Sequence, residues 1–167
     1  MKYSLKRFEE AQSEYFKIAL KELQAGRKET HWMWYIFPQL KGLGDSYMSN
    51  EYGIENLFEA QQYFQHPILR YRYLRLCKLL EEKDCEIHEI FDYPDDLKLK
   101  SSLTLFKYAA YPEKSSILLF QRLLDKYFNS EECEFTKNSV RNASYTIVQN
   151  VEEIIRRKTW LKKSLNS

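Results

Sequence analysis

The sequence predicts an all-α protein that folds as a single compact domain of about seven helices. Only 4 Gly and 4 Pro occur among 167 residues, which leaves too few turns for a β-sandwich or a β-barrel. Apolar residues recur at helical spacing along most of the chain. With 13 Tyr and 10 Phe, the chain also has enough large side chains to build a sizeable core.

Two helices are expected first. Helical spacing of apolar residues indicates a helix over 5–25, with Ser4 as the cap of its start and Gly26 directly after its end. Thr30 is the predicted cap of a short helix over 31–37.

The next segment predicts two longer helices. The first begins at Ser46 or Ser49 and runs to about residue 65, with a bend at Gly53. The second covers 67–82, because Pro67 suits the first turn of a helix, and His66 before it is expected to act as a cap or turn residue.

The second half of the chain completes the bundle. A short turn over 84–91 precedes a helix that Pro94 opens and Pro112 breaks. Ser115 is the predicted cap of a helix over 116–128. Residues 129–145 are polar and give the weakest indication of helix.

The final helix is basic and divides the chain by charge. Residues 1–135 carry 19 basic and 22 acidic side chains, a net charge of −3, whereas residues 136–167 carry 7 and 2, a net charge of +5. We therefore expect a helical core domain over 1–135 and a basic C-terminal helical extension over 136–167, packed on or beside it.

Composition excludes several classes of protein. The longest apolar run has six residues, too few for a membrane span, and the first ten residues lack the apolar segment of a signal peptide. The three cysteines have no Cys-x-x-Cys spacing, and the three histidines show no metal-ligand spacing, so neither a disulfide framework nor a metal site is expected. These features predict a cytoplasmic protein without membrane partner or cofactor.

The densest candidate for chemistry is the segment around His31 and Trp34. On a helix these two side chains share one face, and Trp32 lies on another. An imidazole held among indoles could serve as a base or a hydrogen-bond donor near neutral pH. The alternative is a core histidine satisfied by a backbone carbonyl.

A glycine-containing loop precedes the next helix. Gly42 and Gly44 would let the backbone approach a ligand, and Ser46 stands at a helix start that favours anions. The alternative is a tight turn between helices.

The other polar cluster surrounds Lys98. Ser101 and Ser102 follow it at i+3 and i+4, so a lysine and two hydroxyls share one helix face, which suits a phosphate or a carboxylate. Asp95 and Asp96 precede this lysine in the first turn, where they also complement the helix dipole.

Several stretches resemble a bacterial family of domains of unknown function, number eighteen-ten, which is often labelled calpastatin. The similarity covers roughly residues 7–128, and the stretches that carry it are Arg7-Phe8, Ala11-Gln12, Tyr15, Gly26–Lys28, His31–Trp34, Ile36–Gln39, Gly42–Gly44, Tyr52, Glu59-Ala60, Tyr63, His66-Pro67, Asp95–Ser102, Thr104–Phe106 and Leu124–Phe128. The resemblance implies a mainly helical fold and no known reaction. Nothing in the sequence resembles a disordered protease-inhibitor repeat.

These observations predict a pocket between the helix of His31 and the helix of Lys98. An indole would form its floor, and an anionic or nucleotide-like ligand of the ADP-ribose type would fit it. The predicted ligand-binding residues are Trp32, Trp34, Gln39, Gly42, Gly44, Ser46, Lys98, Ser101 and Ser102. If the protein is an enzyme, His31 or Asp96 would be the acid or base of a hydrolysis or group transfer.

The alternative function is a non-catalytic protein-interaction module that uses the basic C-terminal helix. In that case the tryptophan-rich segment is only core. Nucleic-acid binding through the same helix is a weaker expectation, because a net charge of +2 disfavours avid nonspecific binding.

Overall fold

The computed structural model describes residues 4–166, and ten helices form within them. They are α1 (Lys6–Ala25), α2 (Met33–Ile36), α3 (Tyr47–Tyr52), α4 (Leu57–Gln65), α5 (Pro67–Glu82), α6 (Ile87–Ile90), α7 (Asp95–Ala109), α8 (Lys114–Phe128), α9 (Glu134–Ala143) and α10 (Tyr145–Leu165). The prediction of an all-α domain is confirmed. The predicted number of helices is lower because the segment 46–65 forms two helices, α3 and α4, and because α6 and α9 form where the sequence indicated a turn and a polar segment with little sign of helix.

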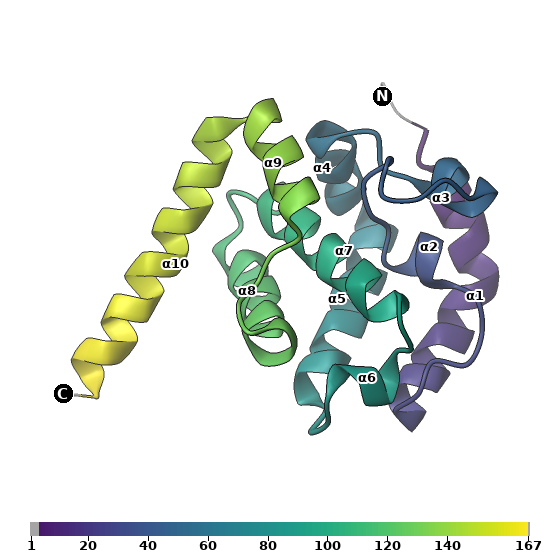
Figure 1. Cartoon of the computed structure of the whole chain (residues 1–167), viewed down its shortest axis with the longest axis horizontal. Helices are drawn as coiled ribbons and strands as arrows, with labels where there is room; N and C mark the ends of the chain where they lie inside the picture. Colours follow the sequence, from purple (N-terminus) through teal and green to yellow (C-terminus); the bar gives the residue numbers. More distant parts are fainter. Residues whose placement is uncertain (1–3, 167) are drawn as a thin grey trace.

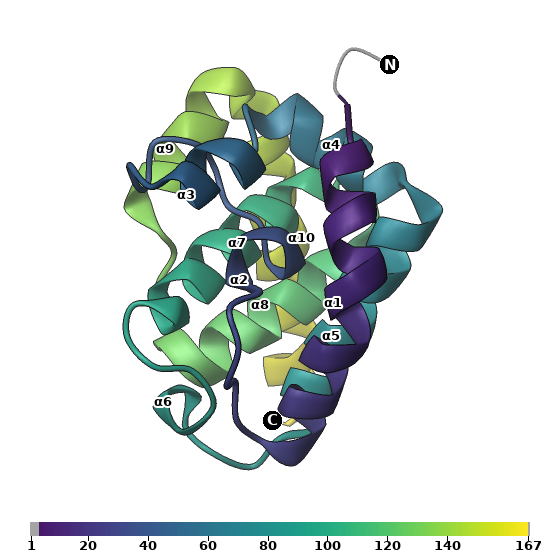
Figure 2. The same cartoon turned by 90° about the vertical axis from the view of Figure 1, so that its right-hand side faces the viewer.

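Helix α7 is the centre of the bundle. It packs against α4, α8, α9 and α10, and every residue from 101 to 109 is buried (Figures 1 and 2). Helices α1 and α5 pack against each other beside it, and α8 covers α5. This central position explains why α7 shows little difference between its faces in the sequence.

Aromatic side chains fill the space between these helices. Tyr73 of α5 packs against Phe106 of α7 with ring centroids 4.4 Å apart, and against Phe120 of α8 at 5.6 Å. Trp32 and Phe37 are completely buried at the α2 side of the same core. Such ring pairs contribute beyond the area that they bury, so the aromatic content predicts the core correctly.

Helix ends are partly as predicted. Gly26 ends α1 with φ of 88°, Ser46 caps α3, and the His66 side chain accepts a hydrogen bond from the backbone of Leu69. The predictions for Ser4, Thr30 and Ser115 are wrong, because α1, α2 and α8 begin after Leu5, Trp32 and Glu113 without a side-chain cap from these residues.

One predicted helix is two. The segment 46–65 is divided between α3 and α4, because Ile54 leaves the helical path to form an isolated parallel bridge with Leu40. The backbone N–H of Ile54 donates to the carbonyl of Gln39 at 2.9 Å. Asn56 then caps α4 by accepting hydrogen bonds from two backbone N–H groups.

The basic C-terminal segment forms the end of the bundle. The expected boundary at 135/136 lies within α9, and α9 packs against α7, α4 and α10. Helix α10 packs against α7, α8 and α9 and runs along one edge of the molecule to the C-terminus (Figure 1). Among the described helices, none has the length and apolar character that crossing a bilayer requires.

Candidate functional site

A cleft of about 920 Å³ opens beside the first half of α7. One wall comes from α2 and the loop after it, and the opposite wall comes from the α8–α9 loop and the start of α9. The lining residues are Trp34, Gln39, Leu43, Tyr93, Pro94, Leu97, Lys98, Lys100, Ser101, Ser130, Glu131, Glu132, Cys133, Glu134 and Lys137. Its volume lies within the usual range for small-molecule sites, roughly 300–1,000 Å³.

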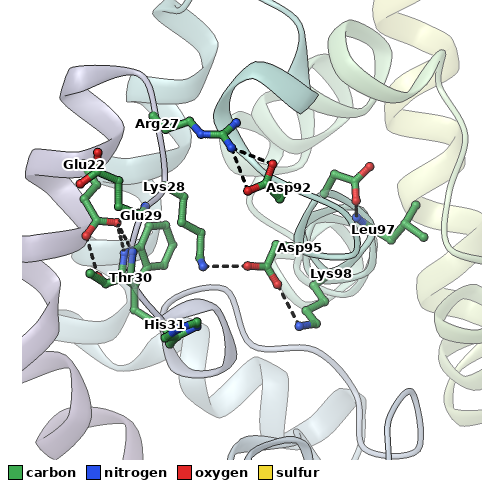
Figure 3. A network of polar contacts seen from close by, with 12 residues as sticks. Glu22, Arg27, Lys28, Glu29, Thr30, His31, Asp92, Asp95, Leu97 and Lys98 are labelled. Carbon is green, nitrogen blue, oxygen red and sulfur yellow. Dashed lines mark hydrogen bonds and ion pairs between the residues drawn. The ribbon is translucent and has the colours of Figure 1, made fainter.

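Three charged side chains, Lys28, Asp95 and Lys98, form a connected series of ion pairs, and Lys98 lines the cleft. Asp95 in the first turn of α7 accepts from Lys28 at 2.7 Å and from Lys98 at 2.8 Å (Figure 3). The Lys98 ammonium lies 3.9 Å from the centroid of a Trp34 ring. An ammonium over an indole face is attracted by the ring quadrupole, so Asp95 and Trp34 together fix the position of Lys98.

The two lysines also set the charge of Asp95. Burial opposes ionisation of this carboxyl group, but hydrogen bonds and charge attraction from Lys28 and Lys98 outweigh it and hold its pKa below the usual value. The cluster of Lys28, Asp95 and Lys98 therefore carries a net charge of +1, and Lys98 is its member that lines the cleft.

The loop before α2 is held to α1 by Glu22 and to α7 by the ion pair between Lys28 and Asp95. Glu22 of α1 accepts from the Thr30 hydroxyl at 2.6 Å and from the Trp32 indole N–H at 2.8 Å. These hydrogen bonds, with those from two backbone N–H groups, outweigh burial and lower the pKa of Glu22. The loop is thereby fixed against α1.

The opposite wall is held by buried ion pairs. Glu132 accepts from Lys107 of α7 at 2.5 Å, from Lys137 of α9 at 2.6 Å and from the Tyr108 hydroxyl at 2.7 Å. Burial opposes ionisation of Glu132, but its partners outweigh it and lower its pKa, whereas burial dominates at Lys107 and lowers the pKa of that ammonium. The α8–α9 loop is thereby attached to the central helix.

The two walls differ in charge. The α7 wall presents Lys98 and Lys100, whereas the opposite wall presents three glutamates and one lysine, Glu131, Glu132, Glu134 and Lys137. Lys100 and Glu131 approach each other at 3.4 Å across the cleft. A ligand with an anionic group and several hydroxyl groups would find donors on one wall and acceptors on the other.

Four of the predicted ligand-binding residues meet at this cleft. Trp34, Gln39, Lys98 and Ser101 all line it, although they come from two segments far apart in the sequence. The Ser101 hydroxyl donates to the backbone carbonyl of Leu97 at 3.0 Å, which leaves its oxygen able to accept.

Two other predicted residues lie in the core instead. Trp32 is completely buried and donates its indole N–H to Glu22. Ser102 is completely buried, and its hydroxyl pairs with that of Tyr73 at 2.9 Å. A serine on the apolar face of α7 is therefore explained by a partner on α5 that the sequence pattern does not reveal.

The glycine loop lies next to the cleft but does not line it at Gly42, Gly44 or Ser46. Gly42 has φ of 97°, and a Cβ atom there would lie 3.2 Å from the Phe135 ring. The glycine is thus required by the backbone and by packing against α9. Leu43 carries this loop into the wall.

The predicted acid or base residues do not line the cleft. His31 is exposed beside Thr30 in the loop before α2 (Figure 3), because that helix begins only at Met33. The expectation that indoles surround its imidazole is therefore wrong. Asp96 accepts from the backbone N–H of Leu97 at 2.8 Å, and Asp95 makes the contacts to the lysines.

Sequence reasoning missed most of the opposite wall. On the α7 wall it also missed Lys100, which lies two residues after Lys98, a spacing that does not place both side chains on the same helix face. Glu132, Cys133 and Lys137 come from the polar segment 129–145, whose approach to α7 has no signal in local periodicity. Within residues 4–166, no three His, Cys, Asp or Glu side chains gather as a metal site requires.

Comparisons with known proteins give a family and a structural relative. A family described as "Protein of unknown function (DUF1810)" matches residues 2–140. The crystal structure of the conserved hypothetical protein Rv1873 from Mycobacterium tuberculosis is 44% identical, with a TM-score of 0.76, and the match covers 81% of this chain and 95% of that chain. No curated protein matches the chain.

Proposed function

This chain belongs to the family described as "Protein of unknown function (DUF1810)", and because that description names no activity, we propose a function from the site. The cleft beside α7 binds a small anionic ligand that also carries an aromatic ring and sugar hydroxyls, a nucleotide-like compound of the ADP-ribose type. The observation that carries the proposal is the meeting of Trp34 and Lys98 at the cleft, with the ammonium 3.9 Å from the ring centroid.

Each part of such a ligand finds a matching group. Phosphate oxygens accept hydrogen bonds from Lys98 and Lys100. Ribose hydroxyls donate to the carboxylates of the opposite wall, among them Glu131, whose side chain is 71% exposed. The base contacts Trp34 and the ring of Tyr93, which is 79% exposed at the mouth of the cleft.

We propose binding rather than a defined reaction. His31 and Asp96 lie outside the cleft lining, so the structure offers them no direct contact with a ligand seated there. The alternative function, a protein-interaction module, concerns α10, which begins at Tyr145 beyond the residues matched by the family.

Calorimetric titration with four compounds tests the proposal. ADP-ribose should bind most tightly and AMP next, while adenosine and ribose 5-phosphate, which lack the phosphate or the base, should each bind weakly. Trp34→Leu should weaken ADP-ribose binding about tenfold, since base stacking on an aromatic side chain contributes roughly 1–3 kcal/mol.

Trp160→Leu is the matched control, because Trp160 is an exposed indole on α10 that does not line the cleft. Its affinity for ADP-ribose should equal that of the unaltered protein. Equal binding by all four compounds, or equal losses in the two tryptophan variants, would contradict the proposal.

A further inference from the structure

The apolar stripe of α10 continues beyond the part of the helix that packs on the core. Val148 and Val151 are buried, and Ile154 is partly buried against the core. Leu161 and Leu165 continue the stripe at i+7 and i+11 from Ile154, yet they are 50% and 86% exposed. Residues at this spacing lie on one side of a helix, so α10 presents two leucines that the described part of the chain does not cover.

Leu161 lines a second groove of about 470 Å³ between α10 and the start of α8, and Leu165 follows it one turn further along α10. Tyr111, Pro112 and Leu118 form one side of the groove, and Ile154 and Leu161 form the other. The groove opens where the C-terminal half of α10 diverges from α8 (Figure 1). An apolar groove between two helices is a surface on which the apolar face of a further helix can lie.

The rim of this groove is cationic. Lys114, Arg157 and Lys158 line it, and its only acidic lining residue, Glu153, is paired with Arg157 at 2.7 Å. Two more lysines follow at 162–163, where the C-terminal end of the helix dipole favours them. The dipole gives no reason for the three cations on the rim, which lie away from the last turn of α10.

The positive charge of the groove distinguishes between two candidate occupants, a second copy of α10 and an acidic helix of another protein. A second copy of α10 would bring two sets of five cations together, Arg156–Lys158 and Lys162-Lys163 of each helix, and like charges in contact oppose association. An acidic helix has the opposite charge and can place its own apolar stripe on Leu161 and Leu165. The family match ends at residue 140, so α10 lies beyond it, whereas the α8 side of the groove lies within it.

We propose that the groove between α10 and α8 docks an acidic amphipathic helix of a partner protein. The apolar side chains of that helix lie on Leu118, Ile154 and Leu161, and its carboxylates face Lys114 and Lys158. This is helix-in-groove recognition, in which apolar anchors give affinity and charges give orientation. The inference does not depend on the ligand of the cleft.

Fluorescence anisotropy of a labelled probe peptide tests it on the full chain. The probe is a Leu/Glu peptide of about 18 residues, five helical turns, with Leu at i, i+3, i+4 and i+7. It should bind at least about tenfold more tightly than a peptide of the same composition in shuffled order, and more weakly as the salt concentration rises. A Leu/Lys peptide with the same stripe should not bind.

Variants locate the contact. The double variant Leu161→Ser with Leu165→Ser changes two exposed side chains and should weaken the probe at least about tenfold. Lys158→Glu should do the same, whereas Lys78→Glu, the same charge change at an exposed position on α5, should leave binding unaltered. Circular dichroism melting of each variant shows whether the fold is retained.

Three results would overturn the proposal. They are equal binding of the ordered and shuffled peptides, no binding of either, and unaltered binding in variants that retain the fold. Tighter binding of a DNA or RNA oligonucleotide than of the acidic peptide would also overturn it, in favour of a nucleic-acid surface around Trp160.

Discussion

Replacing Lys98 by Met separates ligand binding from folding. The substitution keeps a side chain of similar length and removes the ammonium that lies over Trp34. A hydrogen bond between charged groups contributes about 1.5–3 kcal/mol. Because 1.4 kcal/mol corresponds to a tenfold change, we expect Lys98→Met to weaken ADP-ribose binding roughly 10- to 150-fold.

The effect on stability should be much smaller. Asp95 keeps its contact with Lys28 at 2.7 Å, so the substitution leaves no carboxylate without a cation. The Lys98 side chain is 19% exposed, and loss of its ion pair should lower the free energy of unfolding by less than about 1 kcal/mol. Lys21→Met, at an exposed position on α1, is the control for loss of one positive charge.

Calorimetric titration gives the affinity, and urea denaturation followed by circular dichroism gives the free energy of unfolding. The reasoning is refuted if Lys98→Met binds ADP-ribose as tightly as Lys21→Met does. It is also refuted if the loss of binding is fully accounted for by a loss of folded protein at the titration temperature.

Three further predictions concern the cleft walls. Glu131→Gln should weaken ADP-ribose binding about two- to fivefold, because a neutral amide oxygen accepts a ribose hydroxyl more weakly than a carboxylate does; calorimetry would show the loss, and unaltered or tighter binding would contradict this. Glu132→Gln should lower the free energy of unfolding by roughly 3 kcal/mol at neutral pH. Because folding lowers the pKa of Glu132, its contribution to the free energy of unfolding is present above the ordinary glutamate pKa and is lost as pH falls through the lowered value. Urea denaturation should therefore show that the difference in stability between the unaltered protein and Glu132→Gln becomes smaller in acid. A difference that does not change with pH would count against the ion pairs. Gly42→Ala should lower the melting temperature, because an alanine at φ of 97° is strained by roughly 1–2 kcal/mol. Gly44→Ala should lower it less. Equal effects of the two substitutions would show that the positive φ at Gly42 is not the cause.

Features that depend on neighbours in sequence were predictable. Gly26 after α1, Pro67 at the first position of α5 and Ser46 before α3 act through their own backbone or the next turn. The apolar spacing likewise gave the long helices and most of the core.

Features that depend on distant partners were not predictable. Ser102 of α7 can be buried because its hydroxyl pairs with that of Tyr73 on α5. The Thr30 hydroxyl donates to Glu22 of α1 instead of capping α2. The break between α3 and α4 follows from the bridge of Ile54 to Leu40. No local pattern encodes these contacts.

The candidate site shows the same division. Trp34 and Lys98 both line one cleft, and each belongs to a motif whose residue types are unusual enough to be recognised in the sequence. The wall at Glu132 comes from a polar segment without periodicity, and three distant side chains fix its position. That Glu132 forms part of the cleft wall can therefore be seen only in the folded structure.

The three tryptophans provide the most direct test of the central claim. Trp32 is buried with its indole N–H on Glu22, Trp34 lines the cleft, and Trp160 is exposed on α10. Each indole N–H gives a separate signal in a proton–nitrogen NMR spectrum. On titration with ADP-ribose we predict that the Trp34 signal moves most and the Trp160 signal stays in place. Movement of Trp160 alone, or of none of the three at high ligand concentration, would contradict a ligand site at this cleft.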